Sequence, residues 1–358
     1  METSTDLLRT LAGEIGVRQC GTEAAARAAE AIAAAFRELG LDPVFQEFPI
    51  LRYDAEEPEL SIDGERWHAG PCMYAHPGVC EGEVEALSDG VWRVGEGRLA
   101  RSIFGRGPIP FVGRLSDAGH IATPPTAFLS RADSERIRAG QHARLVVRGS
   151  FVPGQRDRNV IARIRGARDD ERVVVGAHYD AVWRGPGAID NATGVEGLRR
   201  VAAHFAGTEP ARTIELVAFG AEEVGLVGAR RFVADARDRG ALGSIVGMVN
   251  LDCIGYGEKL ELLCSPTTLL ERTQAAAQRL GLTQRYEVVT ELGQEAGTDH
   301  LPFAQAGVPA VSILHFPYEE YHLPEDTLAL VDERQLGDAV ALAIDLVQSL
   351  VDDPVPRG

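Results

Sequence analysis

Lysine is almost absent from this chain of 358 residues, because Lys259 is the only one and the remaining basic side chains are arginines. Lysine and arginine together number 36 against 53 acidic residues, which gives a formal net charge of -17 at pH 7. A protein that holds nucleic acid through phosphate contacts needs a basic surface. The charge balance therefore argues against a nucleic-acid partner, whereas it is compatible with bound cations.

Cysteine is also scarce, and long apolar runs are missing. The five cysteines include no C-x-x-C pair, and an odd, scattered set does not indicate a disulfide framework. No apolar run is long enough to cross a bilayer, which argues against a membrane protein. The first residues, METSTDLLRTLAGEIG, lack the basic start and apolar stretch of a signal peptide. We therefore expect a cytoplasmic protein; export is the alternative, in which case Cys72 and Cys80 could form a pair.

Three motifs that mark common enzyme classes do not occur either. The chain has no P-loop, no G-x-G-x-x-G after a strand and no G-x-S-x-G elbow. Ser312 lies within an apolar run that is typical of a strand, so it has no nucleophile-like setting. These absences argue against nucleotide-binding enzymes and serine hydrolases.

What the chain does contain, from residue 159 onward, is an alternation of short apolar strands and amphipathic helices. Such an alternation predicts an α/β fold with a mostly parallel mixed sheet that is covered by helices on both faces. The predicted strands are 159–166, 172–178, 213–220, 244–252 and 309–314, and the predicted helices are 194–206, 225–238, 265–281 and 332–351.

The first part of the chain has a different texture. An Ala-rich helix is predicted over 22–39 and a strand over 42–50. From 52 to 150 glycine and proline recur and the apolar runs are short, which is typical of strands between turns. We therefore predict a catalytic domain made of residues 1–51 and 151–358, and a small, mostly β insertion over 52–150. The insertion contains strand-like runs at 82–87, 98–105, 109–115 and 142–149, and a short helix beginning at Ser130 that Asp133 caps.

Five side chains that can bind metal follow the predicted strands or lie in Gly/Pro-rich loops of the second half. Ligands of an open α/β sheet bind outside the carboxyl ends of its strands. Five ligands of mixed N and O type are too many for one catalytic zinc and suit two ions that share a carboxylate. They occur in the order His178, Asp190, Glu223, Asp252 and His322.

Each of these residues also has a simpler explanation when it is considered alone. Asp190 is in a loop before a helix, where aspartate is usually a cap or turn residue. The adjacent pair Glu222–Glu223 is equally typical of a first helical turn, where acids favour the helix dipole. Spacing alone does not choose between His322 and His300 as the last ligand. Only the order of the whole set along successive strands favours a metal centre.

Taken together, these stretches resemble peptidase family M28, the zinc-dependent di-zinc aminopeptidases. The resemblance covers about residues 155–350, and the N-terminal helix and strand also look like the start of this family. The matching stretches are GAHYDAV (176–182), GAIDNATG (187–194), AFGAEEVGLVGA (218–229), VNLDCIG (249–255), GTDHLPFAQAGVPA (297–310) and YHLPEDT (321–327).

The resemblance implies two zinc ions, although cobalt or manganese suits similar sites. His178 and Asp252 would bind one ion, and Glu223 and His322 the other. Asp190 would bridge them, and the peptide bond that follows it would be cis. The resemblance thus favours His322 over His300, which becomes a structural or pocket-lining residue together with Asp299.

The same resemblance assigns three catalytic roles. Glu222 would act as general base and then as general acid, Asp180 would orient His178, and Tyr321 would help to stabilise the oxyanion. The implied reaction is hydrolysis of the N-terminal peptide bond of a peptide or small aminoacyl substrate by a zinc-activated water. The block TPPTAFLSRADSERIRAGQHARLVVRG (123–149) resembles the end of a protease-associated domain.

Three other functions are kept as alternatives. A glutaminyl-cyclase-like acyltransferase would share the fold and use one zinc. A carboxypeptidase would need a basic residue for the substrate carboxylate, for which Arg184 is a candidate. A non-catalytic binding module is disfavoured because the five ligands and Glu222 are all present.

Overall fold

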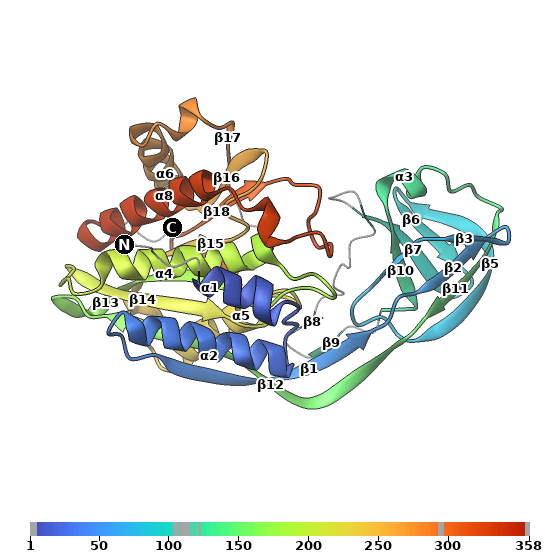
Figure 1. Ribbon diagram of the computed structural model, residues 1–358, viewed down its shortest axis with the longest axis horizontal. Helices are drawn as coiled ribbons and strands as arrows, with labels where there is room; N and C mark the ends of the chain where they lie inside the picture. The colour runs from blue at the N-terminus through green and yellow to red at the C-terminus, as the bar shows by residue number, and fades with distance from the viewer. Residues whose placement is uncertain are drawn as a thin grey trace.

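The computed structural model describes residues 6–102, 107, 115–116, 119–120, 123–292 and 297–354. Within these residues two eight-stranded sheets occupy opposite ends of the longest axis of the molecule (Figure 1). One sheet is flanked by helices, whereas the other is almost entirely β. The strand predicted over 109–115 falls almost wholly outside the described residues.

The first sheet has parallel strands at its centre. β13 pairs in parallel with β14 and β15, and β15 pairs in parallel with β18. Antiparallel neighbours lie on both sides of these four strands, which confirms the predicted mixed, mostly parallel sheet. In sheet order the strands are β1 (Val44–Ala55), β12 (Gly149–Ile164), β14 (Arg212–Phe219), β13 (Arg168–His178), β15 (Ile245–Leu251), β18 (Ala310–Phe316), β16 (Lys259–Ser265) and β17 (Val288–Leu292).

Helices cover both faces of this sheet, as the sequence predicts. Val173 and Val175 of β13 pack in a core with α2, α4, α6 and α8, whereas Val174 between them packs with α5 and α7 on the opposite face. Burial of each such valine contributes about 1.5–3 kcal/mol. The helices are α1 (Asp6–Arg9), followed by a π-helical turn (Thr10–Ile15), α2 (Glu23–Glu38), α4 (Thr193–Phe205), α5 (Val227–Asp238), α6 (Thr267–Arg279), α7 (His300–Gln305) and α8 (Glu333–Asp352).

Two long strands connect the two sheets. β1 and β12 pair in antiparallel fashion from Val44↔Ile161 to Ala55↔Gly149 and run out of the first sheet toward the second (Figure 1). The second sheet has its own apolar core, which includes Leu60, Leu99 and Leu145. Its strands, in sheet order, are β3 (Glu65–Trp67), β2 (Glu59–Ile62), β11 (His142–Val147), β5 (Gly78–Ser88), β6 (Val91–Val94), β7 (Gly97–Arg101), β10 (Thr126–Leu129) and β4 (Gly70–Pro71).

The helix predicted at Ser130 is present as α3 (Arg131–Ser134), and the Ser130 hydroxyl accepts the Asp133 N–H at 3.0 Å. A separate two-stranded ladder joins β8 (Leu115–Ser116) and β9 (Gly119–His120). The domain boundaries at 52 and 150 stay predictions.

All five cysteines are buried and free, so the pair considered for Cys72 and Cys80 is not formed. Among the described residues, no helix has the length and apolar character that crossing a membrane requires.

Candidate metal centre

The predicted metal ligands come together at one edge of the first sheet. His178 is the last residue of β13, Asp252 directly follows β15, and Glu223 lies in the turn after β14. These strands are parallel, so their carboxyl ends meet at the same edge. Asp190 lies in the turn Ala188–Ala192 before α4, and His322 lies in the loop after β18.

The ligand atoms form two groups of three that share Asp190. One group contains His178, Asp190 and Asp252, and the other contains Asp190, Glu223 and His322; within each, the ligand atoms lie within 4.8 Å of one another. Asp190 Oδ1 is 3.1 Å from His178 Nε2, and its Oδ2 is 3.1 Å from His322 Nε2. The two oxygens of one carboxylate thus face different histidines, which is the arrangement that a bridging ligand requires.

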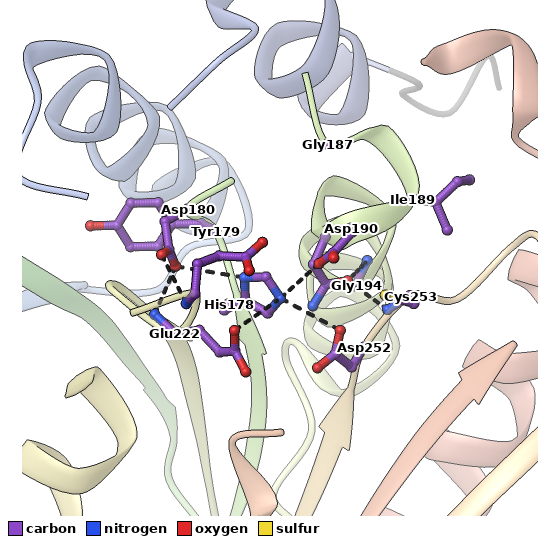
Figure 2. A network of polar contacts seen from close by, with 12 residues as sticks. His178, Tyr179, Asp180, Gly187, Ile189, Asp190, Gly194, Glu222, Asp252 and Cys253 are labelled. Atoms are coloured by element: carbon purple, nitrogen blue, oxygen red, sulfur yellow. Dashed lines mark hydrogen bonds and ion pairs between the residues drawn. The ribbon is translucent and has the colours of Figure 1, made fainter. Parts of the chain in front are cut away.

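Distances within the two groups are similar. Asp252 Oδ1 is 3.5 Å from His178 Nε2, and Glu223 Oε2 is 3.4 Å from His322 Nε2. Glu222 Oε2 is farther from His178 Nε2, at 4.0 Å. Figure 2 shows Glu222, Asp190 and Asp252 converging on the His178 ring. Glu222 also forms a possible ligand group with His178 and Glu223.

The electrostatics of this site fit a bound cation. Burial, followed by the charges of neighbouring carboxylates, raises the pKa of Glu223 well above its usual value, and Glu223 Oε1 has no hydrogen-bond partner. Crowded carboxylates repel one another unless a cation neutralises them. Imidazole and carboxylate donors are among the groups that bind zinc in proteins. The residues present therefore fit zinc.

Asp190 is the exception among these acids. Burial opposes its ionisation, but hydrogen bonds from His178 and His322 outweigh burial and hold the pKa of Asp190 below its usual value. Asp190 therefore stays ionised between the two imidazoles. The peptide bond between Asp190 and Asn191 is cis, as the resemblance implies.

Asp180 connects the histidine to the glutamate pair. Its carboxylate accepts the N–H groups of Glu222 at 3.0 Å and Glu223 at 3.2 Å. Its Oδ1 is 3.6 Å from His178 Nδ1 (Figure 2). A carboxylate in this place fixes the orientation of the imidazole and raises its basicity. The two atoms are too far apart for a hydrogen bond, so the orienting role of Asp180 stays a prediction.

We expect Asp180→Asn to weaken zinc binding or kcat/KM by about 10- to 100-fold, because the amide presents an N–H group where a carboxylate oxygen accepted one. Zinc titration and steady-state kinetics measure the effect. The matched control is Asp63→Asn, since Asp63 also accepts a backbone N–H, that of His142 in the second sheet. Equal behaviour of the two variants would contradict the role of Asp180.

The two remaining predicted residues differ in their surroundings. The Tyr321 ring stacks on the His322 ring with centroids 3.8 Å apart. Burial raises the pKa of the Tyr321 hydroxyl well above its usual value, so the hydroxyl stays a hydrogen-bond donor. His300 begins α7, is fully buried and lies 2.5 Å from Thr298 Oγ1 through its Nδ1. His300 belongs to neither group of possible metal ligands, whereas His322 lies in the group with Asp190 and Glu223.

Sequence reasoning missed three residues that hold the Asp190 turn: Arg18, Asn191 and Asp326. Asp326 lies within the motif YHLPEDT, and Asn191 directly follows Asp190, so both were in view without a role. Arg18 gave no signal, because its partners at Tyr179 and Gly187 lie more than 160 residues away along the chain.

Residues from the second-sheet segment also reach this site. Met73 and Tyr74 pack in an apolar cluster with Cys20, Ala221 and Val224. Ala221 and Val224 flank the glutamate pair in the chain. A small pocket beside Glu223 is lined by Met73, Trp183, Cys20, Val224 and others. The segment between β1 and β12 therefore forms part of the wall next to the metal ligands.

Comparison with known proteins identifies the family to which this chain belongs. The model described as peptidase family M28 matches residues 159–347, which contain all five proposed ligands and Glu222. The chain belongs to peptidase family M28. Membership confirms the predicted family and the prediction of a peptidase. The matched range does not include residues 52–150, so a protease-associated domain in the insertion stays a prediction.

Two curated proteins and one solved structure are also similar to this chain. Aminopeptidase YwaD of Bacillus subtilis (strain 168) is 26% identical over 93% of this chain and 82% of its own length. A probable zinc metalloprotease of Pyrenophora tritici-repentis is 27% identical; the match covers 53% of this chain and 55% of that relative. The structure of the zinc aminopeptidase BSAP from Bacillus subtilis aligns with a TM-score of 0.74 at 22% identity, over 95% of this chain and 92% of the other. The last comparison confirms the fold.

Proposed function

We propose that this M28 peptidase is a two-zinc aminopeptidase that hydrolyses the N-terminal peptide bond of peptides or small aminoacyl substrates. The observation that carries the proposal is the Asp190 carboxylate, whose two oxygens lie 3.1 Å from the imidazoles of two separate ligand groups. The similarity to aminopeptidase YwaD over 93% of the chain supports the choice of an exopeptidase that acts at the N-terminus.

His178 and Asp252 would hold one zinc ion, and Glu223 and His322 the other, with Asp190 shared between them. When bound, zinc supplies Lewis acidity that polarises the scissile carbonyl and lowers the pKa of a water toward about 7. In the proposed reaction, side chains of the protein transfer the proton and donate a hydrogen bond to the oxyanion.

Glu222 is the proposed proton carrier. It takes a proton from the water as the water oxygen bonds to the scissile carbonyl carbon, and it gives that proton to the amine as the C–N bond breaks. Burial raises the pKa of Glu222 well above its usual value, which suits a group that must both accept and return a proton. Asp180 holds the Glu222 backbone in place.

Two further features fit this reaction. The Tyr321 hydroxyl, kept protonated by burial, is the proposed donor to the developing oxyanion. The carboxylates that surround the site favour a substrate with a free, positively charged amine. By contrast, Arg184 forms an ion pair with Glu57 at 3.1 Å and stacks on Trp183, so the structure does not favour it as a carboxypeptidase residue.

Metal analysis combined with a substrate panel tests the proposal. We expect two zinc ions per chain, release of chromophore from aminoacyl substrates with a free amine, and loss of that activity in chelator with recovery on adding zinc. N-acetylated versions of the same substrates are the matched control and should not be cleaved. One zinc per chain with ammonia release from an N-terminal glutamine peptide would instead establish the cyclase alternative.

A further inference from the structure

The backbone that carries Asp190 is held by hydrogen bonds at each residue from 186 to 190. Arg18 donates from Nη1 to the carbonyl oxygen of Pro186 and from Nη2 to that of Gly187, the latter at 2.7 Å. The carboxylate of Asp326 accepts the N–H of Ile189 at 2.7 Å and that of Asp190 at 3.0 Å. The Asp326 carbonyl oxygen accepts the Ala188 N–H at 3.2 Å.

Arg18 and Asp326 are both buried, and a buried polar group that loses its hydrogen bond destabilises the fold more than an exposed one. Arg18 is 0% exposed and Asp326 is 1% exposed. Burial lowers the pKa of Arg18 to about 10, so the guanidinium remains charged at neutral pH. Buried backbone groups must be paired, and the Asp190 turn lies outside any strand ladder. Arg18 and Asp326 therefore provide hydrogen bonds that regular secondary structure does not.

The same side chains connect the Asp190 turn to the segments that carry other ligands. Arg18 Nε donates to the carbonyl oxygen of Tyr179, the residue after His178, at 2.5 Å. Asp326 follows His322 by four residues in the same loop. The position of Asp190 is therefore set relative to one histidine from each ligand group.

Asn191 connects the Asp190 turn to the segment that carries Asp252. Its Nδ2 donates to the carbonyl oxygen of Leu251 at 2.9 Å, and its Oδ1 accepts the N–H of Cys253 at 3.1 Å. Leu251 and Cys253 flank Asp252 on both sides. A shift of the turn would thus displace the bridging carboxylate relative to both groups.

We propose that Arg18 and Asp326 are positioning residues that keep the two oxygens of Asp190 directed at separate metal ions and so couple the two sites. The inference rests on the proposed two-zinc function. A bridging carboxylate tolerates little rotation, because turning one oxygen toward its ion moves the other away. Loss of either positioning residue should therefore weaken the second ion more than the first.

The test is zinc titration of Asp326→Asn against a chromophoric chelator. The amide keeps the shape of the side chain but presents an N–H group to a backbone N–H, so one hydrogen bond is lost. We expect affinity for the second zinc to fall by about 10- to 100-fold, as is typical when a group that orients a ligand is changed. The absorption spectrum of the cobalt-loaded protein should change as well, because it reports ligand geometry. Arg18→Lys, which keeps the charge but loses the planar fork, should act in the same direction.

Two control variants separate this role from a general loss of stability. Asp332→Asn removes an exposed carboxylate that accepts the N–H groups of Arg334 and Gln335 at the start of α8. Arg212→Lys changes another buried arginine, which donates to the carbonyl oxygens of Val351 and Asp352. Both controls should lower the unfolding temperature without changing zinc affinity or the cobalt spectrum.

The zinc titration distinguishes failure of the positioning role from failure of the proposed two-zinc site. If the wild-type protein binds two zinc ions and Asp326→Asn and Arg18→Lys do so with unchanged affinity, the positioning role is wrong while the two-zinc site stands. If the wild-type protein binds only one zinc, the two-zinc site is wrong, and the coupling proposal falls with it. If Asp326→Asn does not fold, Arg18→Lys decides the same question.

Discussion

A Glu222→Gln variant is expected to lose about 10²- to 10⁴-fold in kcat while retaining both metal ions. Glutamine has the shape of glutamate but cannot accept the proton of the attacking water. The backbone at this position should not move, because Asp180 accepts the Glu222 N–H at 3.0 Å. Steady-state kinetics on an aminoacyl substrate, together with zinc analysis of the same preparation, measure both quantities.

Each departure from this result identifies a different error. Near-normal turnover would show that another group removes the proton. Loss of zinc would show that Glu222 is a ligand, in agreement with its alternative grouping with His178 and Glu223. Glu38→Gln at the exposed end of α2 is the matched control and should leave both kcat and zinc content unchanged.

Asp190→Ala is expected to reduce bound zinc from two ions to one or none and to lower kcat/KM by more than about 10³-fold. The substitution removes the two oxygens that lie 3.1 Å from His178 and His322. The expected loss is large because both ions lose a ligand, which affects Lewis acidity and substrate positioning together. Zinc analysis after gel filtration and kinetics with added zinc provide the measurements.

The control for this variant is Asp238→Ala, at the exposed end of α5. Circular dichroism establishes that both variants are folded before zinc is counted. Two zinc ions at full occupancy in folded Asp190→Ala would overturn the bridging assignment. Asp190→Asn retains one acceptor oxygen and should fall between the wild type and Asp190→Ala in zinc content.

The ligands at strand ends were accessible from the sequence because short-range patterns determine where strands stop. His178 and Asp252 follow apolar runs that form β13 and β15 in the structure. The same short-range patterns could not decide whether His300 or His322 is the last metal ligand. Both lie in polar stretches, and only the tertiary fold turns His300 toward Thr298 and His322 toward Asp190.

Some fold elements were missed for different reasons. β16 carries a visible alternation, in which Leu260, Leu262 and Cys264 all enter one core, so its signal was present but not used. The short helix α1 and the six-residue α7 are too short to show helical periodicity. The contacts of Arg18 join segments far apart in the chain, and no local pattern encodes them.

The ribbon formed by β1 and β12 also has a consequence for how this protein can vary. Ala55 and Gly149 are paired neighbours, so the chain leaves and re-enters the ribbon at a single point. The entropy of closing a loop grows slowly with its length, so the segment between these residues can lengthen, shorten or be exchanged at small thermodynamic cost. Such changes would leave the register of the metal-bearing strands intact. Their constraint is local: Met73 and Tyr74 must still cover Ala221 and Val224 beside the glutamate pair.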